Sequence, residues 1–210
     1  EKLRSYGFSF VVTIPNFSEY YKEQRALDEA IVKNLKKSEN TANGFDLGSM
    51  GGFYTFEEVE SKLDEMKTNY PNLITSKTQI GNILTHEGRP IYWLRLSDNP
   101  NMDETEPEVL YTALHHAREP NSLSQMVFYL WYLLENYDSD PEVKYLVDNT
   151  AMYFIPCINP DGYIHNENLD PNGGGLWRKN KYSENGELIG VDLNRNYGYE
   201  WGIDDNGSSP

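Results

Sequence analysis

Cysteine, positive charge and long apolar segments are all scarce in this 210-residue chain. The single cysteine, Cys157, excludes a disulfide within the chain, and its place in the apolar run MYFIPCIN favours a buried thiol over a nucleophile. Lys and Arg number 18 against 33 Asp and Glu, a formal net charge of −15. Nucleic-acid binding is therefore not expected, because it needs clustered cations. No apolar run approaches the length of a membrane-spanning helix, so no membrane segment is expected.

Aromatic residues are abundant, with 16 tyrosines and 4 tryptophans, and they argue against disorder. The first fifty residues differ from the rest. Residues 8–14 (FSFVVTI) predict a short strand and 18–37 a polar, partly helical stretch. Residues 38–52 are rich in small and turn-forming residues, which is typical of a linker. We therefore divide the chain into an N-terminal extension, 1–52, and a domain, 53–210.

Within the second part, strand and helix patterns alternate. Thr55 followed by Glu58 forms a capping box before a helical repeat of apolar residues. The following segments predict, in order, a hairpin (76–84 with 91–97), a buried strand (108–116), an apolar helix face (123–134), a short helix (140–149) and a second buried strand (150–159). This order predicts an α/β fold with a mixed parallel and antiparallel sheet flanked by helices.

The segment TALHHAREPNSL (112–123) contains the pattern H-x-x-E in His116 and Glu119. These residues fall where a strand is expected to end and a helix to begin, which is a common ligand-binding position in α/β sheets. Spacing of three on a first helical turn brings an imidazole and a carboxylate to one side, where both can reach a zinc ion. The pattern also fits a capped helix start with exposed histidines. His115 is a ligand only if the register slips by one residue.

Three further motifs favour the zinc site over the capped helix start. LWRKNK contains Arg178, VDLNRNYG crowds Asp192, Asn194 and Arg195 together, and INPDGY (158–163) predicts a turn after a buried strand. Together with H-x-x-E, these motifs resemble the M14 zinc carboxypeptidases of the carboxypeptidase A/B type. That family carries H-x-x-E, N-P-D-G-[YF], L-W-R-K and D-x-N-R-N in this order and at similar separations. The resemblance covers about residues 53–210 and implies a zinc-peptidase-like fold.

The resemblance also implies one Zn²⁺ per catalytic site and a peptide or protein substrate with a free C-terminus. Metal-activated water would attack the peptide carbonyl. His116 and Glu119 match two of the three zinc ligands. Asp192 matches the carboxylate that orients the histidine ligand. Arg178 matches the arginine that stabilises the oxyanion.

The remaining matches concern substrate binding. Asn194 and Arg195 resemble the pair that grips the terminal carboxylate, a task that suits a guanidinium because it makes two parallel hydrogen bonds. Arg118 resembles a subsidiary substrate-binding arginine, although an arginine at a helix start is also often only solvated.

The family's third zinc ligand is a histidine beyond the NRN run, and no histidine follows Asn196 in this chain. The general-base glutamate also lies later. We therefore expect a domain truncated on its C-terminal side, and we expect the isolated chain to bind zinc weakly and to hydrolyse little. Residues 1–37 fit either the end of an inhibitory pro-segment or an unrelated extension. The family implies a secreted or periplasmic protein.

Other functions remain open on sequence alone. A cell-wall peptidase or an amidohydrolase of N-acyl amino acids could use the same scaffold, although LWRKN favours the peptidase branch. A catalytically inactive relative that binds peptide ends is the third possibility.

Overall fold

The computed structural model describes residues 2–32 and 42–203. The chain divides into two compact units, Glu1–Asn40 and Thr41–Pro210.

The first unit contains α1 (Lys2–Ser5) and α2 (Phe17–Val32). The helix expected within 18–37 is confirmed as far as Val32, and residues 33–37 lie outside the described residues, as do 38–41 of the expected linker. The strand expected at 8–14 is wrong, because this segment is irregular and Val11 is 86% exposed. Apolar and β-branched residues favour a strand only when a neighbouring strand supplies hydrogen bonds and packing.

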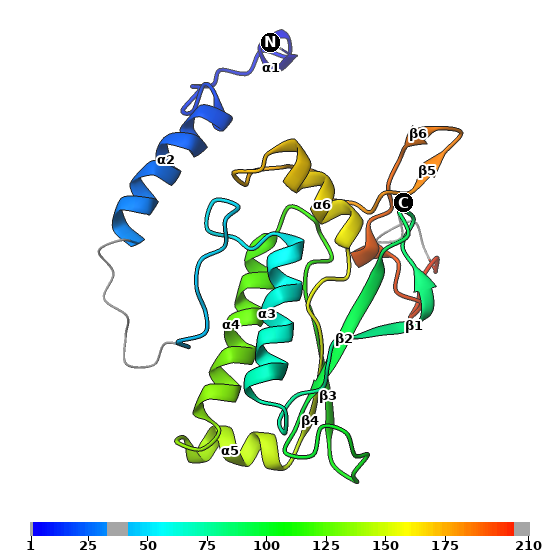
Figure 1. The fold of residues 1–210 in the computed structure, drawn as a ribbon. Coiled ribbons are helices and arrows are strands. Elements are labelled where there is room, and N and C mark those ends of the chain that lie inside the picture. Colours follow the sequence, from blue (N-terminus) through cyan, green and yellow to red (C-terminus); the bar gives the residue numbers. More distant parts are fainter. Residues whose placement is uncertain (1, 33–41, 204–210) are drawn as a thin grey trace. The chain divides into compact units, whose positions relative to one another are not determined.

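The second unit is built on a four-stranded sheet (Figure 1). Its strands are β1 (Thr78–Leu84), β2 (Pro90–Leu96), β3 (Glu108–Thr112) and β4 (Ala151–Ile155), in the order β1-β2-β4-β3. β3 and β4 are parallel and the other pairs antiparallel, which confirms the mixed sheet. The hairpin of β1 and β2 is also confirmed. The parallel pair is joined by α4 (Pro120–Asn136) and α5 (Pro141–Asp148), as a parallel connection requires.

Helices cover one face of this sheet. α3 (Phe56–Asn69) and α4 lie side by side there (Figure 1). The predicted apolar faces of both helices are buried, and they meet Leu94 and Phe154 of the sheet in one core. The expected linker also contributes to this core through Ala42 and Met50, which are 2% and 3% exposed.

Two expectations about the second unit are corrected. β3 is a strand but not a buried one, since it lies at one edge of the described sheet and Leu110 is 61% exposed. N-P-D-G does not close a simple turn. It opens α6 (Pro160–Leu169), with Asn159 capping the helix and Pro160 in its first turn, where the missing proline N–H costs nothing.

After α6 the chain forms irregular segments and a small hairpin. The hairpin consists of β5 (Ser183–Glu184) and β6 (Glu187–Leu188), and the 3₁₀ turn η1 (Leu193–Arg195) follows it. These segments carry the second half of the predicted site residues back to the end of β3.

Candidate functional site

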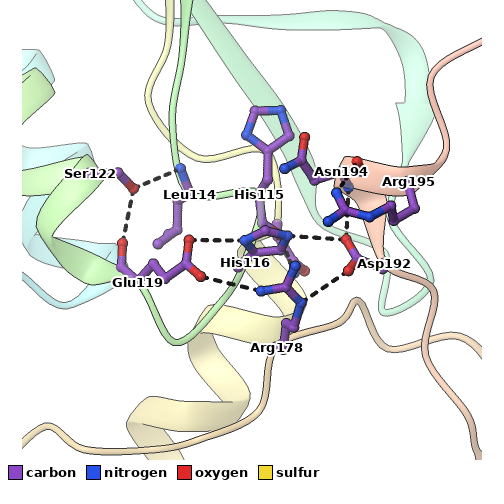
Figure 2. A network of polar contacts seen from close by, with 10 residues as sticks. Leu114, His115, His116, Glu119, Ser122, Arg178, Asp192, Asn194 and Arg195 are labelled. Atoms are coloured by element: carbon purple, nitrogen blue, oxygen red, sulfur yellow. Dashed lines mark hydrogen bonds and ion pairs between the residues drawn. The ribbon is translucent and has the colours of Figure 1, made fainter. Parts of the chain in front are cut away.

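The site begins at a strained turn after β3. Leu114 has a φ of 55°, in the left-handed region that leucine seldom adopts. Its N–H donates to the Ser122 hydroxyl at 3.1 Å, and that hydroxyl donates to the Glu119 carbonyl at 2.9 Å (Figure 2). Ser122 therefore ties the two ends of the H-x-x-E turn together and stabilises a backbone conformation that leucine alone would not favour.

His116 lies between two carboxylates, as Figure 2 shows. Its Nδ1 is 2.9 Å from Glu119 Oε2 and its Nε2 is 3.1 Å from Asp192 Oδ1. The imidazole is buried, with 8% of the residue exposed, whereas half of the Glu119 side chain is exposed. The structure thus brings together the side chains of His116, Glu119 and Asp192.

Arg178 joins the same network from the segment after α6. Its Nε donates to Asp192 Oδ2 at 3.0 Å, and its Nη1 lies 3.4 Å from Glu119 Oε1. One guanidinium therefore bridges the two carboxylates that flank His116 (Figure 2). Because its other N–H groups make no bond within the network, the side chain can still donate to a ligand.

Asp192 is the most heavily hydrogen-bonded of these side chains. Its Oδ1 also accepts the N–H of Asn194 at 3.0 Å, which caps η1. Burial by itself raises the pKa of Asp192, but the hydrogen bonds from Arg178 and Asn194 and the charge of Arg178 outweigh burial and hold the pKa below its ordinary value. The carboxylate is therefore charged at neutral pH and suited to orient a neighbouring N–H.

The predicted substrate-binding residues are accessible but less closely gathered. Asn194 and Arg195 are both exposed on η1 beside Asp192, and Arg195 Nη1 donates to the Asn194 carbonyl at 2.9 Å. Arg118 is exposed and is not part of the network around His116. The first pair is thus free to meet a ligand near His116, whereas nothing in the contacts of Arg118 favours binding over simple solvation.

The donor set fits a zinc ion on chemical grounds. An N–H on Nε2 that points to Asp192 leaves the Nδ1 lone pair facing Glu119, and one imidazole nitrogen beside one carboxylate is a typical pair of zinc ligands. Two ligands of one tetrahedral zinc ion lie about 3.3 Å apart, close to the separation observed here. Among the described residues, no third His, Cys, Asp or Glu lies close enough to share the same ion.

Sequence reasoning missed several residues of this region. The motif predicts a turn for Asn159 and Asp161, yet these residues are only 2% and 1% exposed and their side chains are heavily hydrogen-bonded. The His115 ring lies within hydrogen-bond distance of the Tyr197 hydroxyl, and burial, followed by the nearby His116, lowers the pKa of His115. The same residue types occur in buried polar motifs and in exposed turns, so only the fold could reveal these contacts.

Comparison with known proteins finds similarity to zinc carboxypeptidases in both sequence and structure. A model of the zinc carboxypeptidase family matches residues 59–210. A zinc carboxypeptidase of Saccharothrix mutabilis subsp. capreolus is 36% identical over 151 residues, which is 72% of this chain and 33% of the relative. The crystal structure of carboxypeptidase A from Helicoverpa armigera superimposes with a TM-score of 0.70 at 29% identity, over 96% of this chain and 46% of that one.

Some relatives are named as inactive. An inactive metallocarboxypeptidase of Talaromyces marneffei is 33% identical over 135 residues, or 62% of this chain and 22% of the relative. The chain thus spans less than half of the length of each of these three proteins.

Proposed function

Because the chain belongs to the zinc carboxypeptidase family, we propose that the protein is a zinc-dependent metallocarboxypeptidase that removes C-terminal residues from peptides. One observation carries this proposal. A buried imidazole presents one nitrogen to Glu119 and the other to Asp192, and Arg178 bridges both carboxylates. An imidazole that is oriented by one carboxylate and faces another suits a metal-assisted hydrolase, which supports the proposal.

In this proposal His116 and Glu119 hold one Zn²⁺ per site. When bound, zinc polarises the peptide carbonyl and lowers the pKa of a water molecule. Asp192 accepts a hydrogen bond from the N–H at His116 Nε2, which fixes the tautomer so that Nδ1 is the ligand. A third ligand and a general base belong to the proposal as expectations from the family.

The arginines act on the substrate. Arg178 donates hydrogen bonds to the oxygen of the attacked carbonyl as negative charge develops on it, and loss of one such donor typically costs about 10²–10³ in rate. Asn194 and Arg195 bind the free carboxylate at the end of the peptide, and Arg118 has a subsidiary place. Both Asn194 and Arg195 are exposed beside Asp192, which supports this assignment.

The test uses the full-length protein and peptides with free C-termini. His116→Ala should abolish hydrolysis and reduce bound zinc while circular dichroism remains that of the parent. His86→Ala, which alters an exposed histidine in the hairpin turn, is the matched control and should retain full activity. Undiminished hydrolysis by His116→Ala would remove the zinc assignment.

A second part of the same experiment varies the substrate and tests whether its free C-terminal carboxylate is recognised. Amidation of the peptide C-terminus should lower kcat/KM by about an order of magnitude or more, since charge-assisted hydrogen bonds contribute about 1.5–3 kcal/mol each. Equal rates on amidated peptides would contradict the roles of Asn194 and Arg195. Faster turnover of N-acyl amino acids or of cell-wall peptides would indicate the corresponding alternative hydrolase.

A second candidate function has a specific observation behind it, namely the relatives that are named inactive. An inactive protein would bind peptide ends through the same arginines without hydrolysis. Peptide binding with a free-carboxylate requirement, but no release of C-terminal residues in the presence of zinc, would favour it.

A secreted or periplasmic location is part of the proposal and follows from the family. Within residues 2–32 and 42–203, no helix has both the length and the apolar character needed to cross a bilayer.

A further inference from the structure

The N-P-D-G motif contains a buried amide that touches both halves of the candidate site. Asn159 Nδ2 donates to the carbonyl of His115 and to the carbonyl of Lys179, each at 3.0 Å. Its Oδ1 accepts the N–H of Gly162 at 3.1 Å and so caps α6. Both amide hydrogens are used, and the residue is only 2% exposed.

The two carbonyls are notable for their places in the chain. His115 immediately precedes His116, and Lys179 immediately follows Arg178. The same two segments also meet directly, because the Ala117 N–H donates to the Arg178 carbonyl at 3.0 Å. One side chain therefore holds the backbone that carries the proposed zinc ligand against the backbone that carries the proposed oxyanion donor.

A second amide of α6 holds the other side of Arg178. Asn166 Nδ2 donates to the Trp177 carbonyl at 2.8 Å, and Asn166 Oδ1 accepts the Trp177 N–H at 2.9 Å. Asn159 and Asn166 are seven residues apart, which is about two helical turns and places both on one face. Arg178 thus projects from a short segment that is clamped at the residue before it and at the residue after it.

Glycines make these approaches possible. A Cβ on Gly162 would lie 2.5 Å from the Lys179 carbonyl oxygen, and a Cβ on Gly175 would lie 2.5 Å from the Asn166 side chain. These separations are shorter than any real carbon contact, so a larger residue would push the 177–179 segment away from α6. The glycine of N-P-D-G is therefore explained by close packing against the clamped segment, since its φ is not in the left-handed region.

We propose that Asn159 is a positioning residue that sets the location of the Arg178 guanidinium relative to His116 and Glu119, with Asn166 fixing the opposite flank. The inference rests on the proposed function, because it is that reaction which needs the guanidinium held in place. Displacement of a catalytic group by about 1 Å can cost about 10²-fold in rate. Two clamped flanks limit such movement without contacting the substrate.

The most informative substitution is Asn159→Asp in the full-length protein. Aspartate still accepts the Gly162 N–H and caps α6, but it replaces both donors with an oxygen that faces two carbonyl oxygens. We expect kcat to fall by about 10²-fold with a small change in KM. Asn149→Asp is the matched control, since that amide contacts only the Tyr145 carbonyl at the end of α5, and it should leave kcat unchanged.

A double-mutant cycle separates positioning from general destabilisation. If Asn159 acts through Arg178, then Asn159→Asp in an Arg178→Ala background should lower kcat by only about threefold or less. Multiplicative losses would overturn the proposal. Val143→Ala, a buried truncation in α5, is the control for lowered stability and should leave kcat unchanged at temperatures well below its melting point.

A readout independent of hydrolysis distinguishes this inference from the proposed function. The Nε–H of Arg178 donates to Asp192, so its NMR signal in ¹⁵N-arginine-labelled protein should exchange slowly with solvent and should lose that protection in Asn159→Asp. An unchanged Arg178 signal would overturn the positioning role even in an active enzyme. Absence of hydrolysis by the parent protein, with the signal still dependent on Asn159, would sink the proposed function alone.

Discussion

At His116 one imidazole has a carboxylate at each nitrogen, and the two carboxylates are not equivalent. Asp192 is largely buried and accepts three donors, whereas half of the Glu119 side chain is exposed. A buried and saturated carboxylate suits a fixed orienting role. An exposed one suits a ligand that must meet an ion or a substrate from solution.

The difference can be tested with Asp192→Asn. The amide keeps an oxygen for Arg178 but presents an NH₂ group towards His116, which favours the tautomer that has its proton on Nδ1 and therefore cannot bind metal through that atom. We expect zinc affinity to fall about 10–100-fold in the full-length protein, measured by competition with a chelator. The control is Asp148→Asn, which removes a surface carboxylate that contacts Tyr137 and Lys144. Equal zinc affinity in Asp192→Asn and the parent would contradict the orienting role.

At the scale of the element, α3 shows how a local motif begins a helix. Thr55 Oγ1 accepts the Glu58 N–H at 3.2 Å, and Glu58 Oε2 accepts the Thr55 N–H at 2.8 Å. Glu58 also accepts the Ser49 N–H, so it links the preceding turn to the helix. Burial alone raises the pKa of Glu58, but the hydrogen bonds from Thr55 and Ser49 outweigh it and hold that pKa below its ordinary value of 4.5.

This shift gives a pH dependence with a definite sign. Because the folded pKa of Glu58 is depressed, its contribution to stability is complete above pH 4.5 and is lost as the pH falls through the lower folded value. Glu58→Gln should therefore be less stable than the parent at neutral pH, and the difference should shrink in acid. Urea unfolding across this range is the measurement. Thr55→Ala removes an uncharged half of the same motif and should cost about 0.5–2 kcal/mol with a weaker pH dependence. A gap between Glu58→Gln and the parent that widens in acid would contradict the assignment.

Elements with local signals were predictable, and elements that depend on distant partners were not. The cap of α3 and the apolar face of α4 depend on residues that are close together in the sequence, and both helices form where expected. By contrast, a first helical turn and a common β-turn share similar backbone angles, so N-P-D-G did not distinguish α6 from a turn. Residues 8–14 have strand propensity but no paired strand, and they are irregular.

At the scale of the molecule, the candidate site is assembled from segments far apart in the chain. His116 and Glu119 follow β3, Arg178 follows α6, and Asp192 precedes η1. Sequence spacing within H-x-x-E could place the first two together, but only the resemblance to a family could add the others. The contacts that hold the segments in register, made by Asn159 and Asn166, carried no sequence signal because an asparagine looks the same whether buried or exposed.

The number of donors near His116 should limit the zinc affinity of a protein of these 210 residues. Zinc sites normally combine three or four protein ligands, and the described residues supply two at this position. Calorimetric titration should therefore give an affinity on the order of micromolar or weaker, and His116→Ala should remove that heat. Nanomolar binding would contradict the two-donor account.

Zinc binding at a second cluster of side chains would add to the measured heat, so variants must distinguish the two sites. Asp98, Glu104 and Glu106 place carboxylate oxygens within 4.8 Å of one another. Oxygen-only clusters suit calcium or magnesium better than zinc, so the variant Glu104→Gln with Glu106→Gln should leave most of the zinc heat intact. If the heat of zinc binding is instead retained in His116→Ala and lost in the glutamine variant, zinc binds at the carboxylate cluster in this chain. His116 and Glu119 alone would then not account for zinc binding, and the effect of Asp192→Asn, about 10–100-fold, should be absent from a protein of these 210 residues.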